Sequence, residues 1–332
     1  MGQQPAVYKV EISAKTIIFT VVFILSILLL WVIRGLLLSL FVAFIIMSAV
    51  KPPVSFLEKK GVNRRLAAIM VFAILVVLAG LLLTWVVPPL VVESALLIKQ
   101  LPSMLEAASP AFVDYINIES LFQYAPNITN QAFGIIRSVF SNVMFVLTTL
   151  FFSLYFTFEE GFIKNILTQF FHEKKAKKAA EVFERTEKRL GGWLLGQLVL
   201  MIAVGCMTYI GLSLIGVRYA LPLSIIAGLL EVVPSIGPTI STVPAFIVGV
   251  TQSSFLGFST IALFLIVQQL ENNFLVPYIM KKVTGLNPIV ILISLIIGGQ
   301  LFGVIGMLLS IPFTLFIETI LIEILKTEPQ PK

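Results

Sequence analysis

Long, uninterrupted apolar runs separated by short charged segments dominate the first half of this 332-residue chain. The runs cover residues 16–33, 36–50, 66–87 and 139–158. A helix needs about 20 predominantly apolar residues to span a bilayer, whereas a membrane β-barrel would show alternating positions. The pattern therefore predicts four membrane-spanning helices in this half.

Residues 194–326 repeat a unit made of one span followed by one hydrophobic segment that is broken in its middle. The broken segments lie near residues 222–250 and 288–325. Gly237 in the first segment recurs 66 residues later as Gly303 in the second. Together with the first half, this predicts an all-α, polytopic integral membrane protein with seven or eight hydrophobic helical elements.

The composition supports a membrane protein, because 58% of the residues are apolar and 12% are charged, against roughly 45–50% and 25% in soluble domains. The net charge of +6 is concentrated in short loops, so it indicates membrane topology and not nucleic-acid binding. The chain has one histidine, His172, and one cysteine, Cys206, and no nucleotide-binding or metalloprotease motif. We therefore expect no enzyme activity, no cofactor and no metal site.

Two segments carry most of the positive charge. Residues 51–65 hold five basic side chains against one acid, and residues 159–193 form a basic helical loop. The positive-inside rule places both in the cytoplasm, together with the two termini. The moderately apolar segment 88–138 then lies outside as amphipathic helices, either as a simple connector or as a substrate lid or oligomer contact.

The same rule indicates how the broken segments cross. If each crossed the membrane fully, Lys281 and Lys282 would lie outside, whereas re-entrant hairpins would keep them inside. The rule favours two re-entrant hairpins that enter from opposite faces, as in secondary transporters built from inverted repeats. The second segment is also long enough to include a full crossing, so this alternative stays open.

The first break, EVVPSIGP, combines an acid with helix-breaking residues. Glu231 precedes Pro234, which removes a backbone donor and would free a carbonyl one turn earlier. Gly237 and Pro238 complete the break, and Gly237 permits close backbone approach. A carboxylate at the membrane centre costs about 2.5–3.5 kcal/mol, so this stretch is a candidate ion or solute pathway. The alternative is a structural kink with the acid near the interface.

Two further groups complete the predicted pathway. In QQLENN, Gln268, Glu271 and Asn272 share a helix face, with Asn273 beside them; the alternative is a helix end at the water boundary. At the tip of the second hairpin, small residues would let it approach its partner. That tip consists of Gly298, Gly299, Gln300 and Gly303.

Three ordered motifs, EVVPSIGPTISTVPA, QQLENNFLVPYIM and LNPIVILISLIIGGQLFGVIGMLLSIPF, resemble those of the autoinducer-2 exporter family of bacterial and archaeal permeases. The resemblance covers essentially the whole chain. It implies a homo-oligomeric transporter of the cytoplasmic (inner) membrane, with some members assigned to autoinducer-2 export and others to sodium/proton antiport. Many members have His where this chain has Asn287, so proton coupling here would rest on Glu231 and Glu271.

We therefore expect a secondary transporter that moves a small polar solute by alternating access. The alternative is an antiporter of protons and a monovalent cation such as sodium. A further alternative is a membrane scaffold that acts through residues 88–138 and the basic loop.

Overall fold

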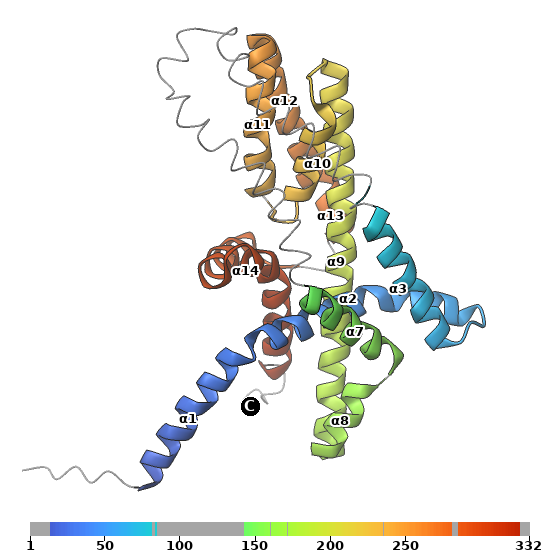
Figure 1. Cartoon of the computed structure of the whole chain (residues 1–332), viewed down its shortest axis with the longest axis vertical. Helices are drawn as coiled ribbons and strands as arrows, with labels where there is room; N and C mark the ends of the chain where they lie inside the picture. The colour runs from blue at the N-terminus through green and yellow to red at the C-terminus, as the bar shows by residue number, and fades with distance from the viewer. Residues whose placement is uncertain are drawn as a thin grey trace, which may run out of the picture.

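The computed structural model describes residues 14–81, 84, 143–159, 161–170, 172–234, 236–280 and 285–325. Throughout these ranges the regular structure is helical and contains no strand (Figure 1). The helices are α1 (Ala14–Val32), α2 (Arg34–Lys59), α3 (Arg64–Leu81), α7 (Val143–Phe158), α8 (Phe162–Phe170), α9 (Glu173–Ile215), α10 (Ala220–Leu230), α11 (Ile236–Gln252), α12 (Ser254–Leu270), the π-helical η2 (Glu271–Leu275), α13 (Val276–Met280) and α14 (Pro288–Leu325). In the described chain, six helical stretches are long and apolar enough to cross a membrane. The predicted all-α, polytopic membrane fold is thus confirmed.

The predicted amphipathic segment 88–138 lies outside the described residues, as do Lys281 and Lys282. The cytoplasmic location of those two lysines, and the topology inferred from it, stay predictions.

The first helices pack around α2. Buried Val54 of α2 contacts Ala67 and Phe72 of α3, and Ser39 shares a 3.0 Å hydrogen bond between its Oγ and Oγ1 of Thr149 in α7. Helix α2 continues past the expected end of its span at residue 50 and through two prolines to Lys59, and Val54 in this extension belongs to the core shared with α3. Helix α1 has no buried residue and extends away from the other helices (Figure 1).

Helix α9 joins the basic segment and the fifth span into one 43-residue helix, about 65 Å long at 1.5 Å per residue. It passes through Gly191, where a Cβ atom would collide with the backbone carbonyl of Ser48 in α2. Glycine therefore lets the two helices cross closely without breaking α9. The helix ends at Gly216, whose positive φ of 79° closes its last turn.

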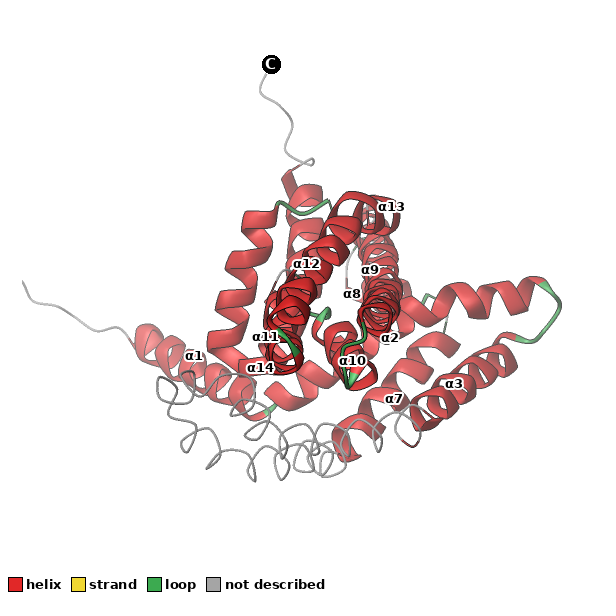
Figure 2. Cartoon of the chain, turned by 90° about the horizontal axis from the view of Figure 1, so that it is seen from above, coloured by secondary structure: helices red, strands yellow, loops and turns green. Residues whose placement is uncertain are grey.

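The first broken segment is a helical hairpin formed by α10 and α11. At its tip a Cβ atom on Gly237 would collide with the carbonyl of Leu230, so the two arms meet closely there. Viewed from above, α9, α10, α11 and α12 form the central group of helices, with α3 and α7 to one side (Figure 2).

The second broken segment is also a hairpin. Gly303 interrupts α14 with φ 62° and ψ −142°, a conformation essentially restricted to glycine. Thr314 Oγ1 donates to Ser294 Oγ at 2.8 Å, and the backbones of Gly298 and Gly306 are in close contact. The arms therefore run antiparallel from Gly303, and both predicted broken segments are confirmed as breaks.

Two apolar clusters lie along α9. At its middle, buried Leu190 and Trp193 join a cluster with Met280 of α13 and Leu315 of α14. Towards its C-terminal end, a second cluster brings together residues of α9, α10, α11 and α12, namely Leu212, Leu223, Ala227, Ala245, Val248 and Phe264. Helix α9 therefore connects the two hairpins.

Candidate ion site at the first hairpin

Glu231 lies at the tip of the first hairpin, directly after the last residue of α10. Its exposed fraction is 0%. Its backbone carbonyl accepts a hydrogen bond from Nε2 of Gln197 at 2.7 Å, and Gln197 is itself buried in α9. The hairpin tip is thus attached to α9 through the backbone, which leaves the carboxyl group out of this bond.

Glu271 begins the π-helical turn that follows α12. It is 4% exposed, whereas the next residues, Asn272 and Asn273, face outward. A π turn closes its hydrogen bonds over five residues and shifts the side-chain spacing of the helix locally. Glu271 is thus buried, whereas the amides that follow it in the predicted cluster are exposed.

The carboxyl groups of Glu231 and Glu271 lie next to each other, close enough for direct electrostatic interaction. Both carboxyl oxygens of Glu231 and Oε2 of Glu271 are buried and have no hydrogen-bond partner of regular geometry among the described residues. None of the ion pairs found in the described ranges includes either acid. Among the described residues, the two acids therefore form a pair that is not ion-paired with a base.

The remaining residues of the first break shape the tip. Pro238 is buried at the start of α11, and its carbonyl accepts from the hydroxyls of Ser241 and Thr242. Pro234 was expected to free a carbonyl one turn earlier, but that carbonyl, on Leu230, accepts a hydrogen bond from the backbone N–H of Val233 at 3.0 Å. It is therefore not available as an ion ligand in this conformation.

Most of the predicted amide cluster is exposed. Gln268 is half-buried, and exposed Asn273 donates from Nδ2 to Oε1 of Gln269 at 2.9 Å. In the second hairpin, Gly298 and Gly299 are half-buried and Gln300 is exposed. The acid pair itself comes from the α10–α11 turn and η2, so a role for these other positions stays a prediction.

Gln197 was missed in the sequence analysis. It is a lone amide inside the apolar part of α9, and a polar side chain within a span usually has a partner or a function. That signal could have identified it, although the sequence alone does not show that its partner is the carbonyl of Glu231.

Comparison with known proteins agrees with this architecture. The family described as "AI-2E family transporter" matches residues 17–326. The "Putative transport protein YrrI" of Bacillus subtilis (strain 168) is 25% identical over 308 residues, which cover 88% of this chain and 86% of that protein. The "Putative permease PerM" of Escherichia coli (strain K12) is 25% identical over 311 residues, which cover 86% and 87%.

A third relative has a higher sequence identity over a shorter part of the chain. The "Putative transport protein YhhT" of Escherichia coli (strain K12) is 38% identical over 135 residues, which cover 39% of this chain and 38% of that protein. The matched length of the family, together with the six spanning helices, settles the assignment. The chain is a multi-pass membrane protein that belongs to the AI-2E transporter family.

Proposed function

We propose that this protein is a secondary transporter in which Glu231 and Glu271 bind the coupling ion, either a proton or a monovalent cation. Family membership supports membrane transport. The observation that carries the coupling role is the adjacency of two buried carboxyl groups that have no basic partner in the described part of the chain.

The physical argument is one of charge. A buried charge is costly unless it is paired, and two neighbouring carboxylates repel each other. The two acids are stable in this buried arrangement only when a proton or a cation neutralises at least one of them. Loss of that ion would favour a conformation in which water reaches the acids. Ion release and the conformational change would then be coupled, as ion-driven alternating access requires.

The first hairpin has features that would allow this conformational change. Gln197 holds the backbone of the tip, while the Glu231 carboxyl group remains available to an ion. Movement of α10 and α11 relative to α12 would change the distance between the two acids. The hairpin would therefore open or close the site.

Two transported species fit this site. One is a small polar solute, for which autoinducer-2 is the candidate that the family description suggests, exported in exchange for the coupling ion. The other is a monovalent cation that is exchanged directly for protons. This exchange is the second candidate because the acid pair could bind either ion.

Proteoliposomes that contain a pH-sensitive dye test the coupling role. Glu231→Gln removes the charge and keeps the size, so proton movement driven by a sodium or solute gradient should fall at least tenfold. Glu58→Gln, an exposed acid on α2, is the matched control and should retain wild-type flux. Wild-type flux in Glu231→Gln would rule out the acid pair as the coupling site.

The same vesicles separate the two transported species. Direct antiport predicts proton movement when sodium alone is added, whereas solute export predicts proton movement only when autoinducer-2 is present. A scaffold without transport activity predicts neither signal.

A further inference from the structure

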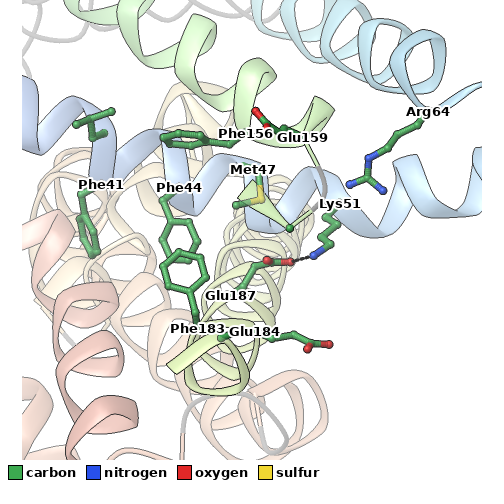
Figure 3. Close-up of a pocket in the computed structure, with 13 residues that line it drawn as sticks. Phe41, Phe44, Met47, Lys51, Arg64, Phe156, Glu159, Phe183, Glu184 and Glu187 are labelled. Carbon is green, nitrogen blue, oxygen red and sulfur yellow. Dashed lines mark ion pairs between the residues drawn. The ribbon is translucent and has the colours of Figure 1, made fainter. Parts of the chain in front are cut away.

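A second site lies away from the acid pair, in a cavity of about 580 Å³ between α2, the end of α7 and the charged half of α9 (Figure 3). Its volume lies within the roughly 300–1,000 Å³ of small-molecule sites. Thirteen described residues line it, apolar in one part and charged in another.

The apolar part is largely aromatic. Phe41, Phe44 and Met47 come from α2, Phe156 from α7 and Phe183 from α9. The rings of Phe44 and Phe183 have centroids 4.6 Å apart, and Phe44 and Met47 are buried. This part offers a surface for an apolar chain and ring faces that attract cations.

The basic side chains of the cavity are engaged by the protein. Lys51 Nζ lies 2.6 Å from Oε1 of Glu187. Arg64 donates from Nε to the carbonyl of Thr157 at 3.0 Å and pairs with Glu58. The positive charges of Lys51 and Arg64 are therefore largely neutralised by acids of the protein.

Two acids of the cavity are not engaged in this way. Glu159 at the end of α7 and Glu184 of α9 are exposed side chains that line the cavity. Neither carboxyl group forms an ion pair or a hydrogen bond with another described residue. The lining thus has three acids against two paired bases, and the surplus charge is negative.

We propose that this cavity binds an amphiphile with an apolar chain and a cationic ammonium head. The head would lie in the charged part of the cavity, to which Glu159 and Glu184 contribute from opposite sides of the Lys51–Glu187 pair (Figure 3), and the chain would extend along the phenylalanines of α2, α7 and α9. A head that carries negative charge without an ammonium group would be repelled by the unpaired acids. This site is separate from the coupling site, and the proposal does not depend on it.

The position of the cavity suits a ligand that comes from the membrane. Along α2 the lining changes from apolar Leu40, Phe41, Phe44 and Met47 to Lys51, the first residue of the basic segment 51–65. An amphiphile in the adjacent leaflet has the same order of chain and head. Its source is either a bilayer lipid with an ethanolamine head or a lipophilic ammonium solute.

Equilibrium binding of radiolabelled dodecyltrimethylammonium to the full chain in phosphatidylglycerol nanodiscs tests the site. We expect saturable binding with one site per chain, and no saturable binding of dodecanoate. The double variant Glu159→Gln and Glu184→Gln should bind the ammonium probe at least tenfold more weakly. Glu181→Gln, an exposed acid of α9 outside the cavity lining, should bind it like the wild type.

A second variant tests the location. Ala180 lines the cavity and is half-buried, so Ala180→Leu should reduce binding by filling space without changing charge. Saturable dodecanoate binding, or wild-type ammonium affinity in both the double variant and Ala180→Leu, would overturn the proposal. Weaker probe binding when phosphatidylethanolamine is added would identify a lipid as the occupant, and unchanged binding would identify a solute; both results retain the ammonium site.

Discussion

At the scale of single residues, the hairpin tip depends on one amide and one glycine. Gln197 satisfies the buried carbonyl of Glu231, and Gly237 provides the space that the carbonyl of Leu230 occupies. These two positions hold the backbone that places the Glu231 carboxyl group beside Glu271.

Gln197→Leu should destabilise the protein, because it leaves the buried carbonyl of Glu231 without its donor. The expected cost is about 1–3 kcal/mol, seen as a lower thermal midpoint in detergent together with slower ion-coupled flux. Gln269→Leu is the control, since it loses only an exposed amide–amide bond. An unchanged midpoint and flux for Gln197→Leu would contradict the role assigned to this hydrogen bond.

Gly237→Ala should lower stability and transport together, since the added Cβ atom meets backbone that cannot move aside cheaply. We expect a cost of about 1–3 kcal/mol, as for other overpacked interior sites. Gly35→Ala in α2, where nothing lies within 4 Å of the added atom, should be neutral or slightly stabilising. Comparison of the two thermal midpoints and flux rates checks the prediction, and equal values would contradict it.

At the scale of elements, the charged half of α9 holds the second hairpin. Arg189 Nη2 lies 2.6 Å from Oε2 of Glu318, and Arg185 Nη1 lies 2.9 Å from Oε2 of Glu323. Both pairs are partly exposed, so each contributes only about 0–1 kcal/mol to stability. Their main effect is to fix the second arm of α14 against α9.

Glu318→Lys should loosen this arm by placing a positive charge opposite Arg189. Hydrogen exchange should become faster in residues 312–325, while the first hairpin remains protected. Glu181→Lys, on the exposed side of α9, is the control and should leave that segment unchanged. Protection that stays equal in residues 312–325 would show that apolar contacts alone hold the arm.

At the scale of the whole molecule, the length of α10 bears on topology. Its 11 residues extend about 16 Å, roughly half of the 30 Å hydrocarbon core. Because α11 folds back beside it, the hairpin should begin and end on the same face of the membrane. The homo-oligomer that the family resemblance implies stays a prediction.

Single cysteines in a Cys206→Ala background test this topology. Arg218→Cys before α10 and Ser253→Cys after α11 should react with a membrane-impermeant maleimide from the same side. Lys60→Cys, between α2 and α3, should react from the opposite side. It lies on the same side as the basic start of α9, and α9 crosses the membrane before it reaches Arg218. Labelling of positions 218 and 253 from opposite sides would exclude a re-entrant first hairpin.

The sequence by itself determined the helical character of the chain, the two breaks and the two acids that were singled out as candidates. Apolar run length and period are local properties, so the spans and the interruptions at Gly237 and Gly303 follow from residues within a few positions of each other. The cost of an acid in an apolar run was likewise enough to single out Glu231 and Glu271.

Only the tertiary structure decided which of these features meet. Glu231 and Glu271 are 40 positions apart in the sequence, and their adjacency depends on how the α11–α12 pair folds back. The π turn at Glu271, the bond from Gln197 and the cavity between α2, α7 and α9 depend on the same packing. No local pattern encodes these contacts, because packing between distant helices is set by the shapes of whole helix surfaces and not by the period along one of them.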